Sequence, residues 1–425
     1  MKPRFIYFIL FFWLSSPGKF KSLLLSERGL NGYEISIILS LTSFISLFSP
    51  SVVSYSADRL GHALVLGFTV CFATAFFCLQ YLPEVSSGMF PKSFGYFAVL
   101  AVLYSTLTAS VHPIMSGLVA KHATRDKTIS FGSERLYGSA AYGIAHVTYG
   151  FILDKYESGV IYFISIFLAF LFLIVLNAYC SSDPAVKPVS IDEKDVTSSI
   201  AECAPQCCST VVDETEESSD FVKIITVLKI IFSSSASTSL LMLAATLACG
   251  GNILHNLGII FFRNTLGTSN TVLGLSIFVS MICEMSMFGF SDYLLKNFGK
   301  EGLFLIAGLS YVVRTLLYTV IKEGWLVICL EIFHGITYAC KTTAINAYVD
   351  EIAPPDMNAT TRSIFTTANS IIGIFGTTIC GYINDAYGPL LLYKGMAITM
   401  LIVSLTYFVS AKLELRAKAE IEKQK

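Results

Sequence analysis

The chain contains 425 residues, of which 54% are hydrophobic and 14% are charged, and its formal net charge is −1. In soluble globular domains roughly a quarter of all residues are charged, so this composition excludes an ordinary soluble protein. A net charge so close to zero gives no basis for a nucleic-acid partner, and we expect none.

Apolar segments long enough to cross a bilayer recur along the whole chain. Each has about 20 mostly apolar residues, the length that a membrane-spanning helix needs, and each is bounded by Gly, Pro or charged residues. Backbone groups in lipid must be satisfied internally, so we expect helices. The segments are 4–25, 33–56, 63–82, 94–119, 129–153, 158–180, 236–262, 270–294, 302–321, 324–349, 360–384 and 389–411. The predicted fold class is an all-α membrane protein with twelve transmembrane helices.

The first segment, MKPRFIYFILFFWL, also fits a secretory signal peptide, because an apolar run follows a basic tip. No small-residue cleavage site follows it, and the internal repeat described below requires it. We therefore interpret it as the first span.

Lys and Arg predict the orientation. If the N-terminus is cytosolic, the loops and tails on that side carry most of the basic residues, among them Arg125, Lys127 and Lys300, whereas the opposite face receives few. The positive-inside rule then places both termini in the cytosol.

A polar gap, 181–222, separates the apolar segments into six and six. It contains SIDEKDVTSS and VVDETEESSD, and such acidic, Ser/Thr-rich stretches do not bury enough apolar surface to fold alone. We predict an N-terminal six-helix bundle (1–180), a disordered acidic cytosolic linker (181–222), a C-terminal bundle (223–411) and a charged cytosolic tail (412–425). The linker cysteines in CAPQCCS could bind metal or carry acyl chains, but their spacing fits no standard zinc pattern, and we favour reduced thiols and no bound metal.

Two pairs of aspartates indicate that the halves repeat each other. Asp58 in SYSADRLG follows the second segment, and Asp292 in GFSDYLLKNFG follows the eighth. Asp154 directly follows the fifth segment and Asp385 directly follows the eleventh, 231 positions apart (385 − 154). The fold is therefore predicted to be two pseudo-symmetric six-helix bundles.

The repeat also predicts broken helices. Ser16-Pro17-Gly18 in the first segment falls opposite Gly250-Gly251-Asn252 in the seventh. Six-plus-six duplications with broken helices at matching places are typical of secondary transporters, whose substrate sites lie between the halves.

The fifth segment carries a polar stripe. In FGSERLYGSAAYGIAHVTYG, five polar or aromatic residues recur at steps of four, three, four and three: Arg135, Ser139, Tyr142, His146 and Tyr149. Polar and aromatic groups on one helical face suit a cavity for a hydroxylated ligand. Packing between helices is the alternative.

Glu284 interrupts the apolar run VSMICEMSMFGF. A lone ionised side chain at mid-bilayer costs roughly 2.5–3.5 kcal/mol, so it should face a partner or a water-filled cavity. Further ionisable or polar residues in the ninth and tenth segments are Arg314, Glu331, His334, Tyr338 and Lys341. The last four of these residues share one helical face. We interpret a partly different set as a proton relay: Glu284, Arg314, Glu331 and His334. The alternative is that these residues only hold the helices together. Asn252, His255 and Lys19 are further candidates for the cavity, although Lys19 also fits a snorkelling role.

The motif SADRLGH resembles the loop signature of the major facilitator superfamily. In that signature an Asp faces an adjacent helix end and a basic residue covers the cytosolic entrance. The resemblance assigns gating to Asp58, Arg59 and the equivalent Asp292. FGSERLYGSAAYG, Glu284, Arg314 and His334 are similar to the lactose-permease-like branch, which includes oligosaccharide and nucleoside proton symporters. The resemblance implies substrate binding by Arg135 and Tyr142 and proton coupling through Glu284, Arg314 and His334. Asn252 and His255 stand where the permease has aspartates, so lactose specificity is not implied.

The predicted function is secondary active transport of a small polar solute (a sugar, nucleoside or organic anion) by alternating access, with a proton as the coupled ion. Substrate contacts are expected from Arg135, Ser139, Tyr142, His146, Asn252, His255, Tyr338 and Lys341. A facilitative uniporter is the alternative mechanism, and a non-transporting receptor or scaffold is a further alternative. We find no enzyme motif and expect no cofactor, a monomer in the lipid bilayer, and the plasma membrane rather than an internal one.

Overall fold

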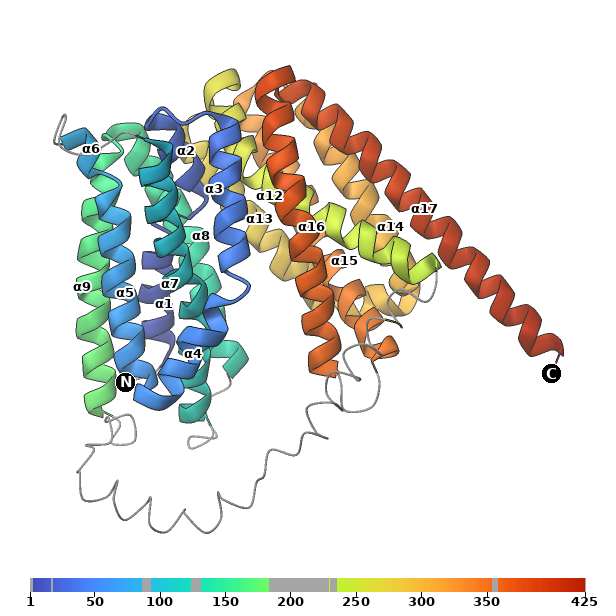
Figure 1. Ribbon diagram of the computed structural model, residues 1–425, viewed down its shortest axis with the longest axis horizontal. Helices are drawn as coiled ribbons and strands as arrows, with labels where there is room; N and C mark the ends of the chain where they lie inside the picture. The colour runs from blue at the N-terminus through green and yellow to red at the C-terminus, as the bar shows by residue number, and fades with distance from the viewer. Residues whose placement is uncertain are drawn as a thin grey trace, which may run out of the picture.

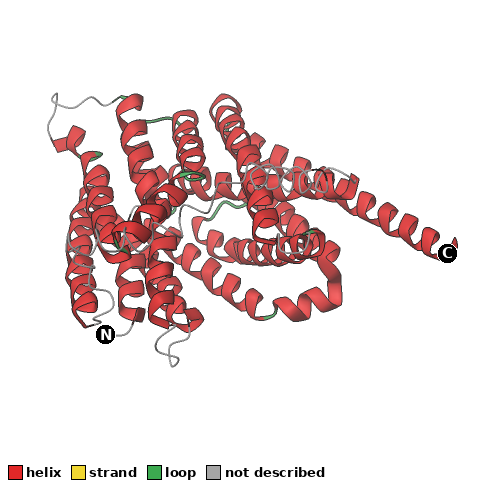
Figure 2. Ribbon diagram, turned by 60° about the horizontal axis from the view of Figure 1, so that its bottom comes forward, coloured by secondary structure: helices red, strands yellow, loops and turns green. Residues whose placement is uncertain are grey.

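The computed structural model describes residues 3–16, 18–85, 93–123, 131–182, 229, 235–353 and 358–424. All regular structure in this part of the chain is helical (Figure 2). The side chains of Asp58 and Arg135 and residues 183–222 of the predicted linker, with its three cysteines, lie outside the described residues.

The helices form two bundles that lie side by side (Figure 1). The N-terminal bundle contains α1 (Pro3–Leu14), η1 (Gly18–Phe20), α2 (Lys21–Glu27), α3 (Gly32–Ile45), α4 (Ser49–Leu60), α5 (His62–Leu79), α6 (Leu82–Val85), α7 (Phe94–Ala123), α8 (Phe131–Lys155) and α9 (Gly159–Ser182). The C-terminal bundle contains α12 (Ser235–Leu266), α13 (Asn270–Gly289), α14 (Ser291–Tyr318), η2 (Gly324–Leu326), α15 (Val327–Ile352), α16 (Asn358–Tyr387) and α17 (Pro389–Gln424).

Eight segments of the described chain are long and apolar enough to cross a membrane, if α1, η1 and α2 together count as the single segment Arg4–Glu27. The number is nine if the bent pair α3 and α4, which meet at 45°, also counts as one span. The helices α8, α15 and α16 fall outside this set. Each was expected to span, and each places polar side chains, such as Tyr142, Lys341 and Arg362, on cavities between the bundles. A helix that lines an aqueous cavity carries fewer apolar residues than one surrounded by lipid.

The first predicted break is confirmed and the second is wrong. Helices α1 and α2 are separated by Ser15 and Ser16 and by the short η1, in which Gly18 has a φ of 29°. Helix α12 runs without interruption through Gly250-Gly251-Asn252. A Cβ at Gly250 would collide with the Tyr311 hydroxyl, so this glycine permits close packing rather than a bend.

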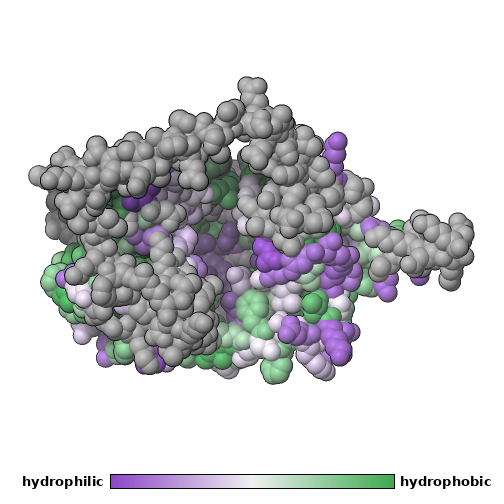
Figure 3. Space-filling model, turned by 90° about the horizontal axis from the view of Figure 1, so that it is seen from below, coloured by the Kyte–Doolittle hydropathy of each residue, from purple (hydrophilic) through white to green (hydrophobic). Residues whose placement is uncertain are grey.

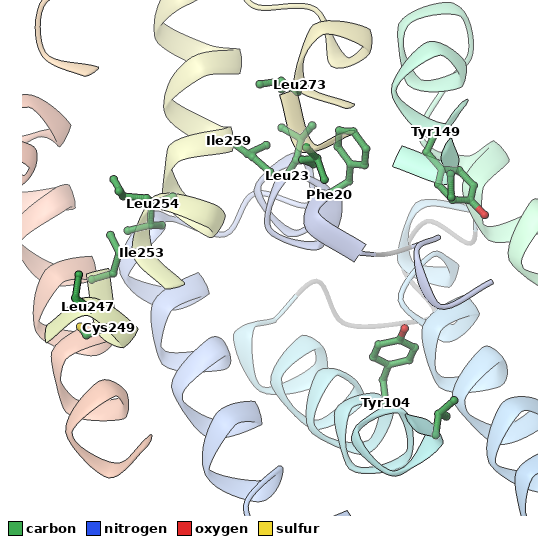
Figure 4. Packing of buried hydrophobic residues seen from close by; sticks show 14 of the residues in the cluster. Phe20, Leu23, Tyr104, Tyr149, Leu247, Cys249, Ile253, Leu254, Ile259 and Leu273 are labelled. Atoms are coloured by element: carbon green, nitrogen blue, oxygen red, sulfur yellow. The ribbon is translucent and has the colours of Figure 1, made fainter. Parts of the chain in front are cut away.

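Apolar residues serve two environments. A buried cluster extends through both bundles, and Phe20 and Leu23 of the N-terminal bundle lie beside Ile259 and Leu273 of the other (Figure 4). On the outside, α5 and α9 expose large side chains that include Phe68, Phe163 and Phe167. Exposed apolar stripes of this kind suit a lipid-facing surface.

The bundles meet at one end and separate at the other. Helix α8 packs on α13, and α16 on α3, through the N-terminal residues of α13 and α3. We call this the closed end; at the opposite, open end the ribbons of the two bundles lie apart (Figure 1).

Candidate functional site

A cavity of about 320 Å³ lies between the bundles. The N-terminal bundle contributes Lys19 from η1 and Tyr142 from α8. Most of the remaining wall comes from α12, α13, α14 and α15, with the polar residues Asn252, His255, Ser280, Glu284, Tyr311, Arg314, His334, Thr337, Tyr338 and Lys341. Its volume is at the small end of the range for ligand sites, which suits a small solute.

A wider cavity of about 680 Å³ connects this site to the open end. The two cavities share Ala248, Asn252, Tyr338 and Lys341. Toward the open end the wider cavity is lined by Ser46, at the end of α3, and by Arg362, near the start of α16. Seen from below, hydrophilic residues lie in and beside a hollow between the bundles (Figure 3). The smaller cavity is therefore reached from one end of the molecule.

Beside the small cavity, Arg314 is held in a buried hydrogen-bond cluster. Its Nη2 donates to Glu331 Oε1 at 2.5 Å and its Nε to the Tyr318 hydroxyl at 2.8 Å. Tyr318 in turn donates to the same Glu331 oxygen at 2.6 Å. The exposed fractions of Arg314 and Glu331 are 1% and 6%, so each buried charge is compensated by the other.

Two histidines extend this cluster into the cavity. Arg314 Nη1 lies 3.1 Å from His334 Nδ1, and a guanidinium only donates, so this nitrogen is the acceptor. A neutral His334 therefore carries its proton on Nε2, which lies 2.9 Å from His255 Nε2. The Nε2 of His255 therefore accepts the hydrogen bond from His334. This assigns the proton of a neutral His255 to its Nδ1. A directional chain runs from Arg314 through His334 to His255, at the cavity wall.

Glu284 lies apart from this cluster. It lines the cavity on α13 and interacts electrostatically with Lys19 of η1 and Lys341 of α15. The structure therefore places Glu331, rather than Glu284, against Arg314. The sequence pattern did not distinguish the two carboxylates, because their separation depends on how α13, α14 and α15 pack.

The predicted stripe on α8 divides into different environments. Tyr142 lines the cavity, whereas Ser139 and His146 do not. His146 is buried: its Nδ1 donates to the Tyr142 carbonyl at 2.7 Å, and its Nε2 accepts from the backbone N–H of Lys19 at 3.2 Å. The helix break at Gly18 allows this contact, because a Cβ there would meet the His146 ring. We therefore correct the expectation for His146: it holds the segment that carries Lys19.

At the closed end, Asp154 of α8 caps the N-terminus of α13 in the other bundle. Its Oδ1 accepts from the Asn270 N–H at 2.7 Å, and its Oδ2 accepts from the Thr271 N–H at 2.8 Å and the Thr271 hydroxyl at 2.6 Å. The Arg263 guanidinium lies 4.0 Å from Oδ1. A carboxylate is well suited to the unsatisfied N–H groups at a helix N-terminus.

Asp385 of α16 makes the equivalent contact with α3. Its Oδ2 accepts from the Tyr33 N–H at 2.7 Å, and its Oδ1 accepts from the Asn384 amide at 3.1 Å. Gly150 and Gly381, one turn before the two aspartates, sit directly against the facing helices, where a Cβ would collide with Asn270 and Ser36 respectively. The repeat seen in the sequence thus corresponds to a pair of contacts between the bundles.

The family model described as the MFS_1 like family, where MFS stands for major facilitator superfamily, matches residues 2–394. The chain belongs to this family. It is an integral, multi-pass membrane transporter of the major facilitator type.

Relatives of this major facilitator protein agree with that assignment. The maltose permease of Geobacillus stearothermophilus is 22% identical over 416 residues, which cover 97% of this chain and 95% of the permease. Among solved structures, the nucleoside transporter NupG superposes with a TM-score of 0.74 at 12% identity, covering 96% of this chain and 98% of that one. A D-xylose-proton symporter gives a TM-score of 0.62 at 13% identity, covering 94% and 95%. At these identities the structures show the fold, so the predicted twelve-helix, two-bundle class is confirmed.

The predicted gating residues of the major facilitator loop remain a prediction. Arg59 is exposed and its guanidinium lies 4.8 Å from the centre of the Tyr55 ring. Asp292 is exposed in the first turn of α14. The described side chains thus place these groups away from the cavity.

Sequence reasoning underrated three groups. The sequence allowed Lys19 to face either the cavity or the membrane surface. Only the fold of η1 shows that it lines the cavity. Ser280 lies one turn before Glu284, a spacing that could have identified it. Asp154 and Asp385 were used as markers of the repeat, and their capping of the opposite bundle depends on tertiary structure.

Proposed function

We propose that the protein is a proton-coupled secondary transporter that moves a small polar solute through the 320 Å³ cavity by alternating access. The observation that carries this proposal is a polar cavity between two bundles that is connected to the open end and covered at the closed end. Alternating access requires the bundles to rock around such a site. The contacts of Asp154 and Asp385 would break when the closed end opens.

Glu284 is the proposed proton carrier. It is a carboxylate on the cavity wall, in a segment that is otherwise apolar, and two ammonium groups interact with it. Protonation would cancel its attraction to Lys19 and Lys341, and deprotonation would restore it. The buried Arg314–Glu331 pair supports this role indirectly, because it holds His334 and His255 in fixed orientations at the wall of the same cavity.

Facilitated diffusion is the second candidate. Arg314 and Glu331 are almost fully buried and bonded to each other, as expected for a static clasp between α14 and α15. If Glu284 has a comparable static role, substrate would move without a proton.

The test measures currents from purified protein in liposomes on a sensor surface, with sugars, nucleosides and organic anions applied with and without a pH step. We expect Glu284→Gln to abolish pH-driven, substrate-dependent current while exchange of the same substrate across the membrane continues. Glu323→Gln is the matched control, because Glu323 is an exposed carboxylate just before η2. Flux that is independent of pH and unchanged in Glu284→Gln would identify a uniporter.

A further inference from the structure

Two ammonium groups face the small cavity from opposite bundles. Lys19 belongs to η1 of the N-terminal bundle, and Lys341 belongs to α15 of the C-terminal bundle. In the part of the chain that the structure describes, neither ammonium forms an ion pair with a carboxylate within 4.0 Å. Charged groups away from bulk water are costly unless a partner compensates them. These two lysines therefore favour a ligand that supplies negative charge.

The other charged groups around the cavity do not remove this excess. Arg314 and Glu331 form an ion pair, so their effects on Lys19 oppose each other: Glu331 attracts its ammonium and Arg314 repels it. Glu284 is the one carboxylate among the described lining residues, and it interacts with both lysines. Two ammonium groups against one carboxylate leave an excess of one positive charge, and an excess of two once Glu284 is protonated.

Both lysines have restrained positions. The backbone N–H of Lys19 donates to the buried His146, and the preceding Gly18 adopts a φ of 29°. The Lys341 ammonium lies 5.1 Å from the centre of the Tyr338 ring, one turn earlier on α15. Positions that are fixed before binding reduce the entropy that a ligand loses.

The remaining wall suits a hydroxylated molecule. Asn252, Ser280 and Thr337 supply an amide and two hydroxyl groups, and Tyr142 and Tyr338 supply aromatic faces. Polar groups of these kinds orient small hydroxylated ligands.

From this arrangement we infer that the substrate is a small hydroxylated organic anion whose carboxylate binds between Lys19 and Lys341. This inference rests on the proposed transport function and specifies its substrate class. When Glu284 is protonated, both ammonium groups become available to the anion; when the anion leaves, Glu284 gives up its proton and again compensates them. One proton and one negative charge therefore move together. The other titratable or charged groups that face this site or act on its lysines come from four helices: Tyr142 from α8, His255 from α12, Tyr311 and Arg314 from α14, and Glu331, His334 and Tyr338 from α15.

The experiment compares gluconate, a six-carbon hydroxylated carboxylate, with glucose as its uncharged counterpart. Thermal unfolding of the purified protein reports binding, since a ligand that binds the native state raises the Tm, and radiolabelled uptake into liposomes reports transport. We expect gluconate, and not glucose, to raise the Tm and to be taken up with protons.

The lysine variants localise the binding. Lys19→Gln and Lys341→Gln should each weaken the apparent gluconate affinity by about 30-fold or more, because a desolvated charge pair loses one partner. Lys341→Arg keeps the charge and should retain most of the affinity, which separates recognition from misfolding. Lys322→Gln, at an exposed position between α14 and η2, should change nothing. Glu284→Gln should keep gluconate binding and remove its dependence on pH.

The outcomes distinguish the two proposals. Uptake of glucose or uridine without stabilisation by gluconate would overturn the anionic substrate and leave transport standing. If gluconate raises the Tm only when Lys341 is present, and no solute is taken up into liposomes, the transport proposal is wrong and the anion site remains supported. No effect of gluconate in either assay would overturn the inference.

Discussion

The two contacts at the closed end occupy equivalent places in the repeat, yet they are bonded differently. Asp154 accepts three hydrogen bonds from Asn270 and Thr271 of α13, with Arg263 nearby. Asp385 accepts one hydrogen bond from α3, at Tyr33. A glycine lies one turn before the aspartate in both contacts, but Gly150 faces the backbone carbonyl of Asn270, whereas Gly381 faces the side chain of Ser36. The two contacts thus share the positions of a glycine and an aspartate, and they differ in their hydrogen bonds and in the groups that face the glycine.

The difference suggests that the contact between α8 and α13 supplies most of the polar stabilisation of the closed end. Hydrogen bonds to charged groups contribute about 1.5–3 kcal/mol each, and partial exposure to water reduces this. The side chain of Asp154 is 21% exposed, so some reduction is expected. The predictions that follow test whether this inequality holds and whether the two contacts open together.

Asp154→Asn should have the largest effect. The neutral amide weakens all three hydrogen bonds to Asn270 and Thr271, and we expect a loss of about 2–3 kcal/mol, or about 30- to 150-fold faster hydrogen exchange at the N-terminus of α13. Hydrogen-exchange mass spectrometry on a peptide covering Thr271 measures this. If the bundles move as rigid bodies, a peptide covering Tyr33 of α3 will also exchange faster; acceleration confined to α13 would show local fraying and count against alternating access through this end.

Asp385→Asn should have a smaller effect. It weakens a single bond between the bundles, so we expect about 1.5 kcal/mol, or about tenfold faster exchange at Tyr33. The same mass-spectrometry experiment provides the comparison. A change as large as that of Asp154→Asn would mean that the hydrogen-bond geometry does not rank the two contacts.

Thr271→Val isolates one bond of the stronger contact. Valine keeps the branched shape and removes the hydroxyl that donates to Asp154, so we expect a loss of about 1 kcal/mol and about fivefold faster exchange in α13. Thr319→Val is the matched control, because the Thr319 hydroxyl bonds only within its own segment, to the Leu316 carbonyl. Equal effects of the two variants would assign the change to the loss of any threonine hydroxyl.

Acidification should have the smallest effect. Asp154 lies at the end of α8, just beyond the predicted span 129–153. Burial raises the pKa of its carboxyl group, but the hydrogen bonds from Thr271 and Asn270 and the charge of Arg263 outweigh burial and hold the pKa below 3.8. A lowered pKa in the folded state means that the stabilisation is present above pH 3.8 and is lost as the pH falls through the lower, folded-state value. Between pH 8 and pH 5, the ratio of exchange rates in wild type and Asp154→Asn should therefore stay constant after correction for intrinsic exchange. A ratio that falls toward one by pH 5 would contradict the assigned ionisation.

The sequence by itself determined the fold class. Apolar segments of membrane-spanning length, a polar gap between six and six of them, and aspartates at matching positions are local features that need no tertiary information. The same kind of reasoning placed Tyr142, His255, Glu284 and Lys341 on one cavity, because a polar residue in a membrane helix is costly unless it faces a partner or water.

Only the tertiary structure decided how these residues divide into groups. Whether Glu284 or Glu331 meets Arg314 depends on the packing of α13 against α15 and of α14 against α15, and a helical stripe specifies a face without specifying the helix opposite it. The roles of His146 and Gly250 also depend on tertiary packing. His146 bonds to η1 through Nε2 and to the Tyr142 carbonyl of its own helix through Nδ1. Gly250 packs against Tyr311 instead of breaking α12. The partners of Asp154 and Asp385 are more than 100 positions away in the chain, and their hydrogen bonds exist only once the two bundles meet.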